Sequence, residues 1–231
     1  MHYLALASDY DGTLSEDGQV SERTMQALER VKASGRKLLL VTGRLFEDLR
    51  QVFPQLDLFD YVVAENGAVL YNPAKSSERL LGEPPDQHFF QVLHDRGVPI
   101  TGGRVIAATW HPYETQVTET IQELNLKLQV IFNKGAVMIL PVGIDKSVGL
   151  LAALYDLQIP AQNVVGFGDA ENDYTFLSQC GCSIAVANAL PSLKEQVDYT
   201  TSASRGDGVV EGIEMLLAND LAEIDQHRNR R

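Results

Sequence analysis

Short apolar segments alternate with longer amphipathic segments over the first part of the chain. Residues 3–8, 37–41 and 61–64 are almost entirely apolar, and each has the length of a short strand. Between them, residues 21–34 and 45–53 carry apolar side chains at helical spacing. Strands that are apolar throughout are typical of a parallel sheet with helices on both faces. This part of the chain therefore predicts a doubly wound, mostly parallel α/β fold.

The pattern changes at residues 83–86, where two consecutive prolines between acidic residues predict a linker. The segments that follow are predicted as a helix at 87–96, strands at 98–100 and 104–110, a helix at 112–124, and strands at 127–132 and 136–140. Gly102 and Gly103 are expected to form the turn of the first strand pair, and Trp110 is expected in the core. One helix and two strands, occurring twice, predict an inserted α+β layer with an antiparallel sheet.

The α/β pattern returns from residue 145 onward. Helices are predicted at 146–156, 171–179 and 208–217, with strands at 163–167 and 183–186. We therefore predict an α/β core formed by residues 1–82 and 145–231, with an α+β cap domain at 83–144. The highly charged tail, residues 219–231, is expected to fray.

The composition narrows the choice of partners. The chain carries 19 Lys and Arg against 31 Asp and Glu, a formal net charge of −12, which repels nucleic acids, so we expect none as a partner. We expect no membrane span, because no apolar run approaches about 20 residues, and no signal peptide, because the first residues lack a basic region. Cys180 and Cys182 are the only cysteines and fit a reducing, cytoplasmic location.

Polar residues gather where the predicted strands end, and ligands of open α/β sheets bind at that edge. Asp9 and Asp11 come directly after the first strand. A turn at Gly12 would bring both carboxylates around one scissile bond, as a nucleophile and a general acid–base require. Asp-Gly after a strand is also a common plain turn, so these two acids alone do not decide between structure and catalysis.

Two further groups could hold an anion. Thr42, Gly43 and Arg44 follow the second strand and offer a hydroxyl and a backbone N–H. Lys146 begins a predicted helix and offers a fixed positive charge. A helix start is an unfavourable place for a cation, so a nearby anion explains Lys146 better than exposure to solvent does. Thr42 and Arg44 are also compatible with a plain helix cap and a surface charge.

A last acidic group follows the strand at 163–167. Asp169, Asn172 and Asp173 offer hard oxygen ligands of the kind that Mg²⁺ prefers. Acids at a helix N-terminus also stabilise the helix dipole, an explanation that is weaker for Asp169 than for Asp173. Taken together, the four groups supply a nucleophile, a metal site and positive charge, which are the parts that phosphoryl transfer needs.

The order of these motifs resembles that of the haloacid dehalogenase superfamily. The motifs are DYDGTL at 9–14, VTGR at 41–44, DK at 145–146 and GDAEND at 168–173, and the resemblance covers essentially the whole chain. The insert between the second and third motifs, and the segment AENGA at 64–68, are similar to the IIB branch, the Cof-type and sucrose-phosphatase-like proteins. The resemblance implies a Rossmann-like core with a cap of the C2 type.

The resemblance also implies a role for each residue. Asp9 would attack phosphorus and carry an aspartyl-phosphate, and Asp11 would protonate the leaving alcohol and then deprotonate water. Mg²⁺ would be held by Asp9, the Asp11 backbone carbonyl and Asp169. Asp173 would reach the metal through an outer ligand or orient Lys146. The transferring phosphate would be held by Thr42, Gly43, Arg44, Lys146 and Asn172.

The implied activity is Mg²⁺-dependent hydrolysis of a small phosphorylated metabolite, such as a sugar phosphate or a phosphoglycolate-like acid. Aspartate at position 11 favours phosphatase over dehalogenase chemistry, because an ester leaving group needs a proton. Two alternatives stay open: phosphomutase-like transfer, and a non-catalytic module that binds a phosphorylated metabolite. The oligomeric state is also open. Candidates for substrate contact in the cap are Arg104, His111, Glu114 and Lys134, although lone charged residues on a small sheet commonly lie at the surface.

Overall fold

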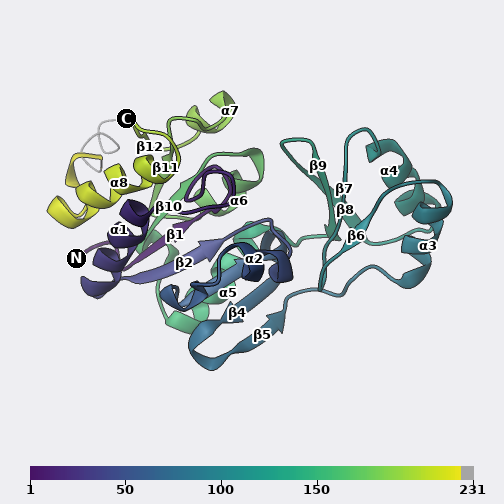
Figure 1. Cartoon of the computed structure of the whole chain (residues 1–231), viewed down its shortest axis with the longest axis horizontal. Helices are drawn as coiled ribbons and strands as arrows, with labels where there is room; N and C mark the ends of the chain where they lie inside the picture. Colours follow the sequence, from purple (N-terminus) through teal and green to yellow (C-terminus); the bar gives the residue numbers. More distant parts are fainter. Residues whose placement is uncertain (225–231) are drawn as a thin grey trace.

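Two sheets organise the chain and form the two lobes of Figure 1. The computed structural model describes residues 1–224. In spatial order, the larger sheet consists of β12 (Tyr199–Thr200), β11 (Cys182–Ala185), β10 (Val164–Gly168), β1 (Ala5–Ser8), β2 (Lys37–Val41), β3 (Tyr61–Ala64), β4 (Val69–Asn72) and β5 (Ser77–Leu80). The strands from β12 to β3 run parallel, and β4 and β5 continue the sheet antiparallel. The predicted doubly wound, mostly parallel sheet is therefore confirmed.

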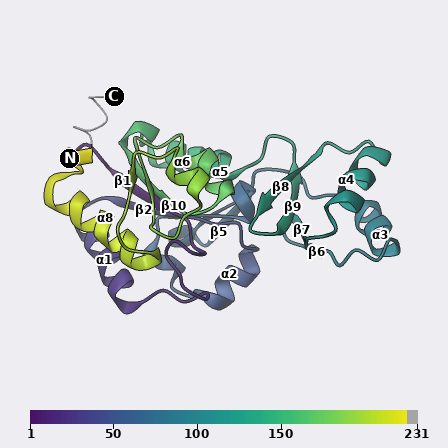
Figure 2. The ribbon, with the colours of Figure 1, turned by 90° about the horizontal axis from the view of Figure 1, so that it is seen from above.

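Helices cover both faces of this sheet, as Figure 2 shows for the longer ones. One face carries α1 (Glu22–Ala33), α2 (Phe46–Val52) and α8 (Arg205–Asn219), and the other carries α5 (Lys146–Leu157), α6 (Tyr174–Leu177) and α7 (Pro191–Lys194). Single 3₁₀ turns lie at Leu56–Leu58, Pro73–Lys75 and Ala161–Asn163. Side chains alternate between the faces of a strand, so Leu6 packs into one core and Ala7 into the other. Burial on both faces explains why these strands are apolar throughout.

The smaller lobe, which we term the inserted layer (residues 87–141), is an antiparallel sheet with two helices. In spatial order its strands are β6 (Thr101–Gly102), β7 (Ala107–Trp110), β9 (Ala136–Pro141) and β8 (Leu128–Asn133), and its helices are α3 (Gln87–Asp95) and α4 (Glu114–Glu123). Phe89, Val117 and Ile139 belong to a separate core of this layer. The predicted order of one helix and two strands, occurring twice, is confirmed, whereas the domain limits at 83–144 stay a prediction.

Several predicted elements differ from the observed ones. No strand is predicted at β4 or β5. Glu78 and Arg79 interrupt the apolar pattern of β5, whereas β4 has three apolar residues and was overlooked. The strand at 98–100 and the two-glycine turn are wrong: β6 begins at residue 101, and residues 103–106 form a longer connection to β7. Residues 171–179 form a 3₁₀ turn (Glu171–Asp173) and the short α6 instead of one helix. Trp110 is not in the core, because its side chain is 64% exposed.

No helix within residues 1–224 combines the length and the apolar character that crossing a membrane requires. The tail predicted to fray begins where α8 ends, and its residues 225–231 lie outside the described residues.

Candidate active site

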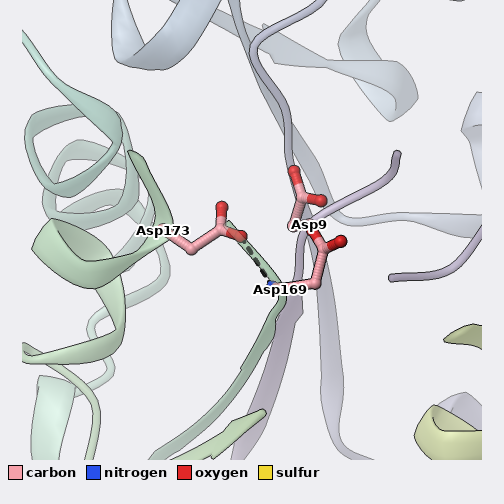
Figure 3. A group of neighbouring side chains, drawn as sticks. All are labelled: Asp9, Asp169 and Asp173. Atoms are coloured by element: carbon pink, nitrogen blue, oxygen red, sulfur yellow. Dashed lines mark hydrogen bonds between the residues drawn. The ribbon is translucent and has the colours of Figure 1, made fainter. Parts of the chain in front are cut away.

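Three neighbouring parallel strands, β10, β1 and β2, end side by side at one edge of the larger sheet. Asp169 directly follows β10, Asp9 follows β1, and Thr42 follows β2. Asp9, Asp169 and Asp173 each place one carboxylate oxygen within 4.8 Å of the others. Figure 3 shows Asp9 and Asp169 close together, with Asp173 hydrogen-bonded to the backbone of Asp169. The acids predicted to lie around one metal ion are therefore brought together.

A buried ammonium group lies beside these acids. The side chain of Asp145 caps the N-terminus of α5, which places Lys146 in the first turn. Lys146 is 1% exposed, and its Nζ donates to Asp9 Oδ1 and to Asp173 Oδ1, both at 2.6 Å. The other Asp173 oxygen accepts the backbone N–H of Asp169 at 2.8 Å. Both Asp173 oxygens are thus engaged in orienting Lys146 and the turn after β10.

The cluster contains three buried carboxylates and two ammonium groups, because Lys146 contacts Asp9 and Asp173 while Lys134 pairs with Asp169. Burial, together with the Asp173 carboxylate, raises the pKa of Asp9 to about 8, although Lys146 acts to lower it. Burial likewise raises the pKa of Asp169, against the ion pair with Lys134. Hard oxygen donors with surplus negative charge suit a divalent cation such as Mg²⁺. The residues therefore fit the metal that the sequence predicted.

Asp11 faces a guanidinium group at the mouth of the site. Its two carboxylate oxygens accept from Arg44 Nε and Nη2, both at 2.7 Å, a bidentate pair. Arg44 Nη1 also donates to Asp48 at 2.6 Å. The guanidinium of Arg44, which was predicted to contact the phosphate, thus forms ion pairs with two carboxylates in this structure. The predicted turn is present, because Gly12 has φ +84°, and a Cβ atom there would lie 2.3 Å from Asp169 Oδ2.

The other predicted phosphate contacts lie together on neighbouring loops. Thr42 is fully buried, and its hydroxyl accepts the backbone N–H of Arg44 at 3.1 Å. Asn172 Nδ2 donates to Asn66 Oδ1 at 2.9 Å. A Cβ atom on Gly43 would lie 3.4 Å from this Asn172 nitrogen. Thr42, Gly43 and Asn172 therefore lie close to one another, and of these Gly43 lines the cleft beside Asp9.

Asn188 is a site residue that the sequence interpretation missed. Its Nδ2 donates to the carbonyl oxygen of Gly12 at 2.8 Å and lies 3.4 Å from Asp169 Oδ2. It thus ties the loop after β1 to the acid that follows β10. Its position shortly after the predicted strand at 183–186 is the signal that could have revealed it, since every other group of the site follows a strand or begins a helix.

A cleft of about 680 Å³ lies between the acids and the inserted layer. Asp9, Asp11 and Arg44 line one side. The side formed by the inserted layer combines apolar residues with polar ones; it includes Ile100, Thr109, Trp110, Asn133, Lys134 and Met138. The exposed Trp110 is thus a wall of the cleft and not a core residue. The cleft offers apolar surface and a cation to whatever lies beyond the phosphate position.

Only one of the four charged candidates from the inserted layer lines this cleft. Lys134 Nζ lies 2.6 Å from Asp169 Oδ2. His111 and Glu114 instead pair with each other at 2.8 Å. Arg104 forms ion pairs with acids of the larger lobe, Glu47 at 2.6 Å and Glu78 at 3.2 Å. Lys134 is therefore the candidate that the structure brings to the acids.

Replacing Lys134 by methionine is expected to strengthen Mg²⁺ binding roughly two- to fivefold, since a half-exposed ion pair contributes about 1 kcal/mol or less. The ammonium and a metal ion would compete for the same Asp169 oxygen. Titration calorimetry measures the affinity. Lys127→Met is the control, because Lys127 is an exposed lysine of the same layer. Unchanged or weaker Mg²⁺ binding in Lys134→Met would contradict the competition.

Comparison with known proteins gives the family. A profile of haloacid dehalogenase-like hydrolases matches residues 6–96 and 102–213. A protein named phosphoglycolate phosphatase from Methanothermobacter thermautotrophicus is 30% identical over 218 residues, which cover 90% of this chain and 96% of that protein. The chain therefore belongs to the haloacid dehalogenase-like hydrolases, and the resemblance seen in its motifs is confirmed.

Solved structures agree on the fold. A haloacid dehalogenase-like hydrolase from Bacteroides thetaiotaomicron aligns with a TM-score of 0.79 at 20% identity, covering 93% of this chain and 99% of that one. A sugar phosphatase of subclass IIB aligns with a TM-score of 0.74 at 18% identity, covering 92% and 98%. Within its family, the chain falls in the class of phosphoric monoester hydrolases.

Proposed function

We propose that this chain is a Mg²⁺-dependent phosphatase that hydrolyses a small phosphorylated metabolite through an aspartyl-phosphate on Asp9. The observation that carries the proposal is the convergence of Asp9, Asp169 and the buried Lys146 at one sheet edge. Asp9, the Asp11 backbone carbonyl and Asp169 would hold the metal, with Asp173 beside them. A divalent ion there supplies positive charge to the oxygens of the transferring phosphate.

The residues divide the reaction into two steps. Asp9 attacks phosphorus as the ester bond breaks, and Asp11 gives its proton to the leaving oxygen. Water then cleaves the aspartyl-phosphate and returns a proton to Asp11, which releases inorganic phosphate and restores both acids. Lys146 fixes the Asp9 carboxylate. Both Asp11 oxygens accept from Arg44 here, so Asp11 would turn away from Arg44 before it gives its proton. Contacts to the phosphate oxygens would come from Thr42, Gly43, Lys146 and Asn172.

Two substrate classes have support. The relative from Methanothermobacter thermautotrophicus is named a phosphoglycolate phosphatase, and a solved neighbour is a sugar phosphatase. A cleft of about 680 Å³ has room for either. Residues 83–144 would act as the cap that closes this cleft and excludes water. The acidic net charge, together with Cys180 and Cys182, which no disulfide joins, supports a cytoplasmic enzyme without a nucleic-acid or membrane partner.

The direct test is release of inorganic phosphate, with and without Mg²⁺, from a panel of sugar phosphates, 2-phosphoglycolate and nucleotides. Mg²⁺-dependent release from at least one ester is the expected result. Phosphomutase activity would instead convert one sugar phosphate into another with no free phosphate. Binding without any turnover would support the non-catalytic alternative and contradict the proposal.

Asp11→Asn is expected to reduce kcat by about 10²- to 10⁴-fold for alkyl phosphates, because the leaving alkoxide then receives no proton. For p-nitrophenyl phosphate the reduction should be much smaller, since nitrophenolate leaves without protonation. Parallel kinetics with both esters measure the difference. An equal reduction for the two esters would contradict the acid role of Asp11.

A further inference from the structure

The turn η2 (Glu65–Gly67) lies between the phosphate-site loops and the inserted layer. Its first two backbone N–H groups donate to the carbonyl oxygens of Arg44 and Thr42, at 2.9 and 3.0 Å. The side chain of Asn66 accepts from Asn172 at 2.9 Å. The turn also packs against the start of α5, which carries the buried lysine of the site. One short segment therefore contacts the loop of Thr42 and Arg44, the side chain of Asn172 and the helix that carries Lys146.

The side chain of Glu65 extends in the other direction, to the inserted layer. It is 1% exposed. Its Oε1 accepts the backbone N–H of Arg104 at 2.9 Å, and its Oε2 accepts those of Val105 at 2.8 Å and Ile106 at 3.1 Å. Glu65 Oε1 also accepts the backbone N–H of Phe46 in the larger lobe, at 3.4 Å. A carboxylate forms stronger hydrogen bonds with such N–H groups than a neutral acceptor would. This buried contact holds a backbone segment of the inserted layer against the larger lobe.

Gly103 allows the carboxylate to come this close. A Cβ atom at position 103 would lie 2.6 Å from Glu65 Oε1, which is shorter than any tolerable contact. The glycine pair predicted as a hairpin turn therefore has a different use at its second position, where it leaves room for the side chain of another lobe.

The segment held by Glu65 leads directly into β7. Ala108, Thr109 and Trp110 of this strand line the cleft opposite Asp9 and Asp11. The position of residues 104–106 therefore sets where this wall of the cleft stands relative to the acids.

We propose that Glu65 is a positioning residue that seats the inserted layer over the Asp9 carboxylate and thereby sets the width of the substrate cleft. This inference rests on the proposed phosphatase function. It adds a contact that holds residues 104–106 of the cap at a defined distance from the catalytic acids. Glu65 touches neither the phosphate position nor the cleft wall, and it acts through the backbone of residues 104–106. Its loss should affect substrates in proportion to how much of the cleft they fill.

Glu65→Gln is the informative variant, because the amide keeps the size of the side chain but directs N–H donors at backbone N–H groups. We expect amide hydrogen exchange at Arg104, Val105 and Ile106 to become at least about tenfold faster. The KM for glucose 6-phosphate should rise roughly tenfold, while kcat for acetyl phosphate, whose leaving group is small, should stay within about twofold.

Glu47→Gln is the matched control. Glu47 is an exposed carboxylate that pairs with the side chain of Arg104, so it touches the same segment without holding its backbone. Its exchange rates and KM values should remain those of the wild type. If Glu65→Gln fails to fold, Gly103→Ala tests the same contact from the other lobe, because its added methyl group would push the Glu65 carboxylate and the segment apart.

Three outcomes decide the inference. Equal behaviour of Glu65→Gln and Glu47→Gln would overturn it, and so would an equal loss of kcat for both substrates. If the wild type releases phosphate from neither compound, the proposed function fails for these substrates. Hydrogen exchange then decides the seating role alone, and unchanged exchange at residues 104–106 would overturn it.

Discussion

Asp9→Asn is expected to abolish phosphate release, with a fall in kcat on the order of 10⁴-fold or more, as for other enzymes that lose their nucleophile. Asparagine has nearly the same size as aspartate, but its neutral amide cannot form the aspartyl-phosphate. The protein itself should remain folded. The substitution replaces one of three buried carboxyl groups by an amide of nearly the same shape, and Lys146 keeps its contact with Asp173.

Two measurements make this result interpretable. Steady-state phosphate release from the best substrate of the panel gives the catalytic effect, and thermal unfolding verifies that the variant is folded. Asp57→Asn is the control, because Asp57 is an exposed aspartate outside the cleft. Activity of Asp9→Asn comparable to that of Asp57→Asn would refute Asp9 as the nucleophile, whichever substrate is used.

Lys146→Met is expected to lower the free energy of unfolding by about 3–5 kcal/mol, the usual effect of removing one partner from a buried ion pair. Lys146 is 1% exposed and contacts both Asp9 and Asp173 at 2.6 Å. Methionine fills much of the same volume but leaves two buried carboxylates without their cation. Urea unfolding at neutral pH, in the absence of divalent metal, measures the loss.

The control for this variant is Lys37→Met. Lys37 pairs with Asp60 at 2.9 Å, but the lysine side chain is 46% exposed, so its loss should change stability by about 1 kcal/mol or less. Adding Asp9→Asn to Lys146→Met should recover part of the lost stability, since one unpaired charge is then removed. If Lys146→Met were as stable as Lys37→Met, the buried pairs would not have the strength that the structure implies.

The sequence alone could predict the residues of the site whose positions follow from local rules. Asp9, Thr42 and Asp169 each come directly after an apolar strand, and the ends of parallel neighbours necessarily lie at one edge. Lys146 is similar, because the side chain of Asp145 caps its helix. The order of elements in the inserted layer was predictable as well, because periodicity is a local property.

Other features had no local signal. The pattern predicts Trp110 in a core, yet its side chain is exposed and lines the cleft. Which face of a small sheet is buried depends on the elements that pack against it, and the sequence pattern does not show these. The edge strand β5 was missed, since a strand that is exposed on both faces has no apolar pattern. Asn188 was missed because a lone amide after a strand resembles an ordinary loop residue.

The sequence by itself thus determined the fold class, the order in which the polar motifs follow the strands, and the family of the chain. Only the tertiary structure decided what the side chains at those ends touch. It pairs Arg44 with Asp11, Lys134 with Asp169, and Glu65 with the backbone of residues 104–106. These contacts join segments far apart in sequence. The first depends on how neighbouring strands of the larger sheet end, and the other two depend on how the two lobes pack, which no local spacing of residues encodes.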